Sequence, residues 1–400
     1  MNVAYLKGRI MRVLLTGQVG LDKASYLKAA AQICVQHGMS FETASIGRMI
    51  VEGASGNQTD ATILNLPKNE LQALRKIAWE SVLSLADQAN PEGAFVVNSH
   101  AVLRWHHGPV PALELNTLLR LRPEMLVTLI DDVDLVKKGL ASRGTDVFQL
   151  WELLAWREEE IYITRLMGES LARLTGTVIP FYLVAKKQGP ELFATLLMQG
   201  TSRKAYLSFP VTGLSVSQKD EVDRFKKELS SKLICFDPLA LSERSIVSRA
   251  SSLAEETSNA FKPGLTELFA TTHSPLGAAW ITHLDEFTGL GLVKLVGDGE
   301  RLLGREVLSV MDAIDSQIIA RDFLLIEQSD MIVAYIPADD IGNPRISAGS
   351  QSEVLYAYQN GKGVYIVFPG DSRKLSPWVT EFASASVFAT VDECIARLSV

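Results

Sequence analysis

Two carboxylates in the C-terminal half have the types and spacing for covalent chemistry. Glu353 follows a run of small polar residues, "PRISAGSQS" at 344–352, and leads into an apolar helical stretch. Asp322 lies upstream on a segment with helical periodicity, 316–328. Two carboxylates can act as nucleophile and as acid or base when their surroundings hold their pKa values apart. The alternative for Glu353 is structural, since an acid in the first turn of a helix gains about 0.3–1 kcal/mol from the helix dipole.

The residues just before Glu353 favour an anion site. Ser347 and Ser350 supply hydroxyls, and Gly349 leaves its backbone amide unhindered. These groups precede a predicted helix N-terminus, where amides point outward and a phosphate is stabilised. Asp330 opens a buried strand after Ser329. It is a candidate substrate contact, with a turn cap as the alternative.

A glycine loop in the N-terminal half, "GQVGLDKAS" at 17–25, is a second candidate site. It follows a strand and opens a helix, as a phosphate-binding loop of the form G-x-x-x-x-G-K-[ST] must. In that motif backbone amides cradle the phosphates, the lysine pairs with them and the hydroxyl holds Mg²⁺. The candidate nucleotide-binding residues here are Gly17, Gly20, Lys23 and Ser25.

Two substitutions weaken this loop. Asp22 occupies the second glycine position and Ala24 the hydroxyl position, with Ser25 one residue late. A carboxylate aimed at a phosphate costs on the order of a few kcal/mol in a partly desolvated loop. A binding or purely structural loop is therefore favoured over an active kinase.

Alternating strands and helices must position both sites. Apolar strands are expected at 12–17, 94–101, 125–132 and 177–185, and again at 205–211, 233–239, 330–337 and 363–369. Helical stretches lie between them, including 215–232 and 316–328. This alternation predicts α/β domains with mostly parallel sheets. We expect two domains, 1–202 and 203–400, and the stretch 241–314 stays unassigned.

Composition excludes several classes of protein. The 400 residues are 47% hydrophobic and 21% charged, with a net charge of -7, so no phosphate-backbone footprint for nucleic acid is expected. No apolar run reaches the roughly 18 residues of a membrane span. The three cysteines lie far apart without metal spacing. We expect a cytoplasmic protein that binds neither nucleic acid nor membrane.

Residues 12 to about 185 resemble archaeal-type adenylate kinases and related nucleoside monophosphate kinases. The resemblance is carried by "LLTGQVGLDKAS", by "SIGRMI" and by "VVNSHAVLRWHHGPVPALELNTLLRLRPEMLVTLIDD" at 96–132. It implies a P-loop kinase-like domain that binds nucleotide with Mg²⁺, with His100 and Arg143 as further binding residues. Asn98 and Arg48 stand where that family has aspartates, which again points to a degenerate site.

Residues 205–400 resemble the nucleoside 2-deoxyribosyltransferase superfamily, including its 2′-deoxynucleoside 5′-phosphate N-hydrolase branch. The resemblance is carried by "YLSFPVTG" at 206–213, by Asp322 followed by "SDMIVAY", and by the Ser347-x-Gly349-x-x-x-Glu353 spacing. It implies a Rossmann-like, flavodoxin-like domain in which Glu353 attacks the anomeric carbon and Asp322 serves as acid or base.

The same resemblance implies the remaining properties of the second site. Ser208 and Phe209 fall in the first substrate loop, and Phe209 replaces a glycine there, where it would stack on a base or block the usual pose. No cofactor or metal is expected at this site, and a homo-oligomer is expected. The sequence thus predicts an N-glycosidase or deoxyribosyltransferase acting on a nucleoside or nucleotide, with a 5′-monophosphate slightly favoured. The alternatives are an active nucleoside monophosphate kinase and a non-catalytic nucleotide sensor.

Overall fold

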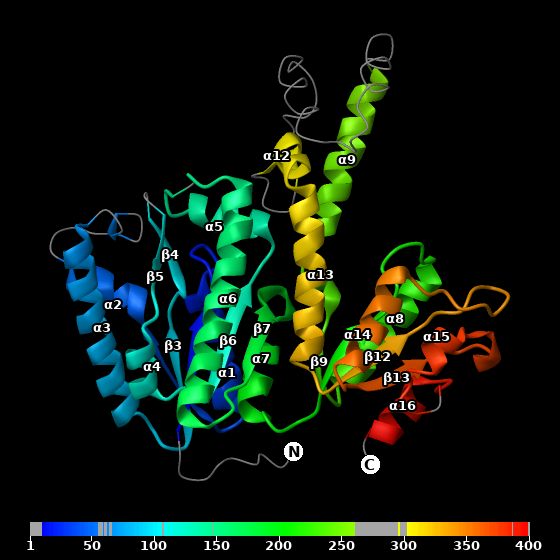
Figure 1. The fold of residues 1–400 in the computed structure, drawn as a ribbon, viewed down its shortest axis with the longest axis horizontal. Helices are drawn as coiled ribbons and strands as arrows, with labels where there is room; N and C mark the ends of the chain where they lie inside the picture. The colour runs from blue at the N-terminus through cyan, green and yellow to red at the C-terminus, as the bar shows by residue number, and fades with distance from the viewer. Residues whose placement is uncertain are drawn as a thin grey trace. The chain divides into compact units, whose positions relative to one another are not determined.

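The chain has a two-domain α/β fold with two parallel sheets, as predicted (Figure 1). The computed structural model describes residues 10–54, 59, 62–63, 66–105, 108–145, 147–260, 295–296, 302–385 and 387–398. The first compact unit runs to Lys187 and includes Leu241–Ile318, and the second comprises Gln188–Ala240 with Ile319–Val400.

The first unit is built on a five-stranded sheet in the order β2-β3-β1-β6-β7, with every neighbouring pair parallel. The strands are β1 (Met11–Thr16), β2 (Ser40–Ser45), β3 (Gly93–Asn98), β6 (Met125–Ile130) and β7 (Phe181–Ala185). β4 (Val102–Trp105) and β5 (Gly108–Pro111) form a separate antiparallel hairpin, and β10 (Leu295–Val296) pairs with β11 (Leu302–Leu303). The central strands are buried on both faces, which explains why they read as continuous apolar runs.

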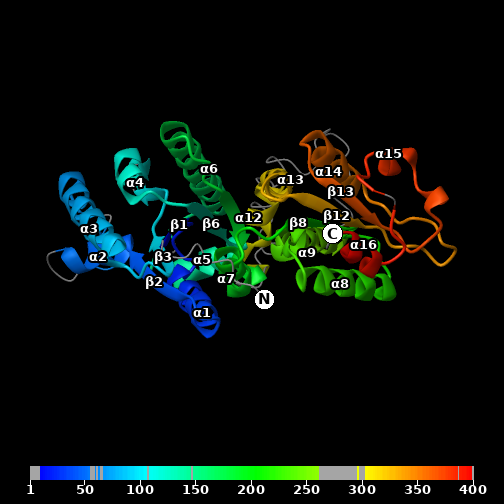
Figure 2. The ribbon, with the colours of Figure 1, turned by 90° about the horizontal axis from the view of Figure 1, so that it is seen from below.

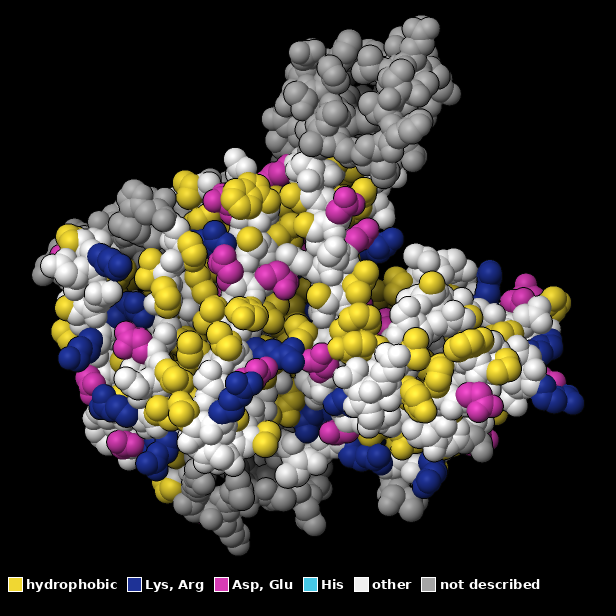
Figure 3. Space-filling model, in the orientation of Figure 1, with side chains coloured by type: hydrophobic (Ala, Val, Ile, Leu, Met, Phe, Trp, Pro, Cys, Tyr) yellow, Lys and Arg dark blue, Asp and Glu magenta, His cyan; other side chains and the backbone are white. Residues whose placement is uncertain are grey.

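Helices cover both faces of this first sheet. α1 and α6 lie on opposite sides of β1 and β6 (Figure 2). The helices are α1 (Lys23–Gln36), α2 (Ile46–Gly53), α3 (Lys68–Gln88), α4 (Leu115–Leu121), α5 (Val133–Ala141), α6 (Leu150–Thr175), α9 (Glu243–Ala260) and α12 (Gly304–Ser309). Hydrophobic side chains gather over α6 on the outer surface (Figure 3), where Trp151 and Tyr162 are exposed.

The second unit contains a four-stranded parallel sheet in the order β13-β12-β8-β9. Its strands are β8 (Lys204–Ser208), β9 (Ile234–Phe236), β12 (Met331–Tyr335) and β13 (Gly363–Val367). α14 (Ala348–Gln359) covers one face of this sheet and α8 (Val216–Ser230) the other (Figure 2). The other helices are α7 (Pro190–Met198), the C-terminal part of α13 (Met311–Glu327), α15 (Pro377–Thr380) and α16 (Val391–Leu398), with short 3-10 turns at Lys186–Gln188, Pro238–Ala240 and Ser372–Lys374.

Strand β8 divides its side chains between a core and a site. Ala205 and Leu207 belong to the hydrophobic core formed with α8 and α16, and Phe209 continues that face. Because side chains alternate across a strand, Tyr206 and Ser208 point to the opposite face, where α14 lies. The two hydroxyls are thereby directed at one helix.

The compact units differ from the expected domains, 1–202 and 203–400. The helix α7 belongs to the second unit, and the unassigned stretch up to Ile318 belongs to the first. A buried ion pair accounts for the second difference, since Arg157 on α6 donates to both carboxylate oxygens of Glu243 on α9, at 2.6 and 3.1 Å. Arg157 also donates to Gln317 on α13. None of these partners is visible from local sequence pattern.

Within the described part of the chain, no helix is both long enough and apolar enough to cross a membrane. The three cysteines are buried as free thiols.

Breaking the Arg157–Glu243 pair should destabilise the first unit strongly. Glu243→Gln leaves a buried guanidinium without its anion, and we expect a loss of about 3–5 kcal/mol in the free energy of unfolding, measured by urea titration. The control is Asp315→Asn, which removes the partner of the exposed neighbouring residue Arg244 and should cost less than about 1 kcal/mol. Equal losses in the two variants would contradict the assignment.

Candidate active site

Glu353 lies beyond the first turn of α14. The helix begins at Ala348, and Ser347 caps it by accepting a hydrogen bond from the Ser350 amide at 3.1 Å. No acidic residue occupies the first turn. The helix dipole acts mainly within that turn, so it does not explain a carboxylate at this position.

Two hydroxyls hold the carboxylate of Glu353. Tyr206 Oη donates to Oε1 at 3.0 Å and Ser208 Oγ donates to Oε2 at 2.6 Å. Burial raises the pKa of Glu353 to about 7, with the Ser208 hydrogen bond acting in the opposite direction and the nearby charge of Asp322 adding to the rise. Burial and the neighbouring Glu353 raise the pKa of Tyr206 well above its usual value, so this phenol stays a hydrogen-bond donor.

Asp322, the second predicted carboxylate, is brought to the same region. It lies on α13, and its charge acts on both Glu353 and Tyr206. Burial raises the pKa of Asp322, while the adjacent Arg321 opposes that rise through charge and hydrogen bonds. The site therefore holds two partly buried carboxylates with different partners, hydroxyls for Glu353 and a guanidinium for Asp322.

The three small residues before Glu353 form the helix cap. The hydroxyls of Ser347 and Ser350 lie 2.9 Å apart, and Ser350 is buried. Gly349 is exposed, and a Cβ added there would come no closer than 3.7 Å to Ser347 Oγ, so packing does not require glycine. The cap lies one turn before Glu353 on the same helix.

Two predicted substrate contacts lie elsewhere. Asp330 precedes β12, where its carboxylate accepts the Lys204 amide at 2.7 Å. It therefore closes the amino end of the β8–β12 pair, whereas Ser208 stands at the carboxyl end of β8. Phe209 is buried in the core and meets Phe225 edge-on at 6.4 Å, with Lys226 over its ring. It is not placed to stack on a base.

In the first unit, the lysine of the glycine loop is turned inward. Lys23 is buried, and its Nζ donates to the carbonyl oxygens of Gly17 and of Gln18 and lies 3.1 Å from His100 Nδ1. Burial lowers the pKa of Lys23 to about 7 and lowers the pKa of His100. The two candidate binding residues thus contact the loop itself.

A glutamate that the sequence did not single out bonds to the backbone of this loop. Glu160, fully buried on α6, accepts the amides of Gly17 at 3.1 Å and Ala101 at 2.8 Å. Burial works against its ionisation, but the hydrogen bond and charges of His100 and Lys23 hold the pKa of Glu160 below its usual range. The loop after β1 and the loop after β3 are therefore joined by an internal anion.

The other loop residues have structural roles or are exposed. Gly17 and Gly20 adopt positive φ angles of 138° and 96°, and a Cβ on either would approach a backbone oxygen within 2.7 Å. Ser25 and Arg143 are exposed, and the Ser25 amide is taken by the Asp22 carboxylate at 3.4 Å.

The residues of this loop do not fit Mg²⁺-nucleotide in the conformation seen. Lys23 is bound to carbonyl oxygens, Asp22 presents a carboxylate, and Ala24 supplies no hydroxyl. Across the described ranges, no cluster of three or more histidine, cysteine or acidic side chains is arranged to hold a metal ion.

The unusual titration of Glu353 gives a stability test. Its pKa is higher in the folded chain than in the unfolded one, so folding favours the protonated form and ionisation destabilises the fold as pH rises from about 4.5 to 7. We expect Glu353→Gln to gain stability relative to the wild type by about 1.4 kcal/mol per pH unit across that window. Denaturant unfolding at pH 5 and pH 8 measures this, and a difference that stays constant would contradict it.

Glu160 gives a second test. Glu160→Gln removes the anion from buried Lys23, and we expect a loss of about 3–5 kcal/mol in the free energy of unfolding at neutral pH. Adding Lys23→Met should recover part of that loss, because the uncompensated cation is removed as well. Glu169→Gln on the same helix, which breaks an exposed pair with Arg165, is the control and should cost less than about 1 kcal/mol. If the double variant is no more stable to unfolding than Glu160→Gln alone, Lys23 and Glu160 are not coupled.

The chain has little detectable sequence similarity to known proteins. No protein-family model matches the chain, and no curated protein matches it in sequence. Among solved structures, the chain is similar to the Deinococcus radiodurans tunicamycin resistance protein, at 12% identity and a TM-score of 0.26, over 42% of this chain and 97% of that one. A similarity at that level carries no argument about function.

Proposed function

We propose that the chain is an N-glycosidase or a deoxyribosyltransferase-like enzyme that cleaves the N-glycosidic bond of a nucleoside or nucleotide. Glu353 is the nucleophile and Asp322 the acid and base. The observation that carries the proposal is the Glu353 carboxylate, which is partly buried, bonded on both oxygens by the hydroxyls of Tyr206 and Ser208, and close enough to Asp322 to be influenced by its charge.

In the first step the ionised Glu353 attacks the anomeric carbon. The C–N bond breaks, its electron pair leaves with the base, and protonated Asp322 delivers a proton to the departing nitrogen. Developing positive charge on the sugar is stabilised by the adjacent carboxylate, as in glycoside hydrolysis generally. The product is a glycosyl ester on Glu353.

In the second step Asp322 takes a proton from water, and the hydroxide equivalent displaces Glu353 from the anomeric carbon. An incoming base in place of water gives transfer instead of hydrolysis. The Glu353 carboxylate is the leaving group here, so the hydrogen bonds from Tyr206 and Ser208 stabilise the charge that it regains.

A 5′-monophosphate is the favoured substrate. The hydroxyls of Ser347 and Ser350 and the N-terminus of α14 lie one turn before Glu353, so a phosphate there would bind while the sugar reaches the carboxylate. A free nucleoside is the alternative. No metal or cofactor enters the proposed reaction, and the homo-oligomer expected from the resemblance stays a prediction.

We propose a structural role for the kinase-like unit. Lys23 is bound to loop carbonyls and balanced by Glu160, which supports a scaffold rather than phosphoryl transfer. Mg²⁺-dependent formation of ADP that is lost in Lys23→Ala would contradict this role.

The test of the glycosidase is release of free base from a panel of nucleosides and their 5′-monophosphates. We expect Glu353→Gln to lower the rate by at least about a thousandfold, because no carboxylate remains to form the ester. The matched control is Glu327→Gln on α13, a glutamate that also accepts a tyrosine hydroxyl, from Tyr356 at 2.6 Å. That variant should keep its activity. Full activity in Glu353→Gln, with the fold intact by circular dichroism, would overturn the proposal.

A further inference from the structure

The side chain of Arg321 is built into the site beside Asp322. Its Nε and Nη2 both donate to Asp322 Oδ1, at 3.1 and 2.9 Å, and Nη2 also donates to the Pro238 carbonyl oxygen at 3.0 Å. Consecutive residues on a helix do not normally face each other. The long arginine side chain folds back toward its neighbour, and only 9% of it is exposed.

Arg321 donates hydrogen bonds to one of the two carboxylate oxygens of Asp322. Within the part of the chain that the structure describes, both hydrogen bonds found on this carboxylate come from Arg321 and end on Oδ1. Oδ2 is therefore the oxygen that can exchange a proton with a substrate. The bond to Pro238, which follows β9 in a short 3-10 turn, fixes the guanidinium from a second element.

Arg321 is also a cation among acids. The charge of Asp237 acts on Asp322, and the charge of Asp322 acts on Glu353. The phenol of Tyr206 lies within reach of the same charges. Asp237 has its own partner in Lys226, at 2.6 Å. Among the described residues, the hydrogen bonds to the Asp322 carboxylate come from Arg321, whose charge also favours the ionised form of Glu353.

We propose that Arg321 is a positioning residue that holds Asp322 by one oxygen and presents the other to the departing base. The inference rests on the proposed function, in which Asp322 delivers and later removes a proton. A lysine keeps the charge but cannot bond in two directions from a planar fork, so the two contributions of Arg321 are separable.

The test compares Arg321→Met and Arg321→Lys with Asp322→Asn and with the double variant Arg321→Met/Asp322→Asn. We expect Arg321→Met to lower kcat about ten- to a hundredfold with little change in KM.

In the plot of kcat/KM against pH, the rising limb of the Arg321→Met variant should move to higher pH, because Glu353 loses a nearby cation and ionises less readily. Arg321→Lys should restore the position of that limb but not kcat. In the Asp322→Asn background, Arg321→Met should have no further effect on kcat.

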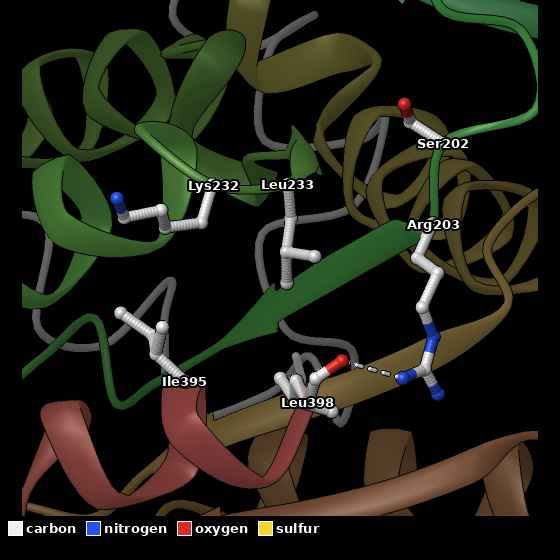
Figure 4. A pocket seen from close by; sticks show the side chains of 6 residues that line it. All are labelled: Ser202, Arg203, Lys232, Leu233, Ile395 and Leu398. Atoms are coloured by element: carbon white, nitrogen blue, oxygen red, sulfur yellow. Dashed lines mark hydrogen bonds between the residues drawn. The ribbon is translucent and has the colours of Figure 1, made fainter. Parts of the chain in front are cut away.

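The matched control is Arg203→Met in the same unit. Arg203 also donates to a backbone oxygen, that of Leu398 at 2.9 Å, and lines a pocket of about 200 Å³ with Lys232 and Ile395 (Figure 4). It precedes β8, whereas Ser208 ends that strand, so its removal should leave kcat and the pH profile unchanged.

The outcomes separate this inference from the proposed function. Base release that survives Glu353→Gln overturns the proposed function. If Glu353→Gln abolishes release but Arg321→Met lowers kcat equally with and without Asp322, Arg321 is only structural and the positioning role is overturned. Carboxyl ¹³C titration gives a readout besides turnover, since Arg321→Met should move the titration of Asp322 to higher pH and Arg203→Met should not. An unmoved titration would also overturn the positioning role.

Discussion

The candidate site depends on the two-residue alternation of one buried strand. β8 pairs with β12 and β9 and sends Leu207 into the core, so Tyr206 and Ser208 must face α14. A shift of one residue in this register would put the hydroxyls into the core and the apolar side chains against Glu353. The hydrophobic core therefore fixes the geometry of the polar groups, because its burial free energy is lost if the register slips.

Buried charge is handled differently in the two units. In the first, the charges of Glu160 and Lys23 favour each other's ionised form, and Glu160 accepts the amides of Gly17 and Ala101. Hydrogen bonds within the unit thus surround this buried charge, as in a structural cluster. In the second unit Glu353 is hydrogen-bonded to two hydroxyls, while the nearby cation, Arg321, bonds to Asp322. In the proposed function this carboxylate is the nucleophile.

The sequence predicted the apolar elements well and the polar ones poorly. The expected strand 125–132 corresponds to β6 and 363–369 to β13, since buried parallel strands read as continuous apolar runs. β2 was missed because "SFETAS" carries no such run. Their motif singled out Glu353 and Asp322, which the structure brings close enough for their charges to interact. Glu160 gave no signal, because its partners lie far away in sequence. Phe209 lies in the hydrophobic core, on the face of the strand opposite Ser208, and a motif position alone does not state which face a side chain takes.

The reactivity that we propose for Glu353 and the stability of the second unit oppose each other. Burial raises the pKa of Glu353 to about 7, which means that the folded chain is destabilised when the carboxylate is ionised. The same burial removes the water that would otherwise solvate the anion, so its attack on an electrophilic carbon requires less desolvation. The hydrogen bonds from Tyr206 and Ser208 limit the destabilisation without adding a full positive charge, which would hold the carboxylate too tightly for nucleophilic attack. Glu160 in the first unit differs, since the hydrogen bond of His100 and the charges of His100 and Lys23 hold its pKa below the usual range.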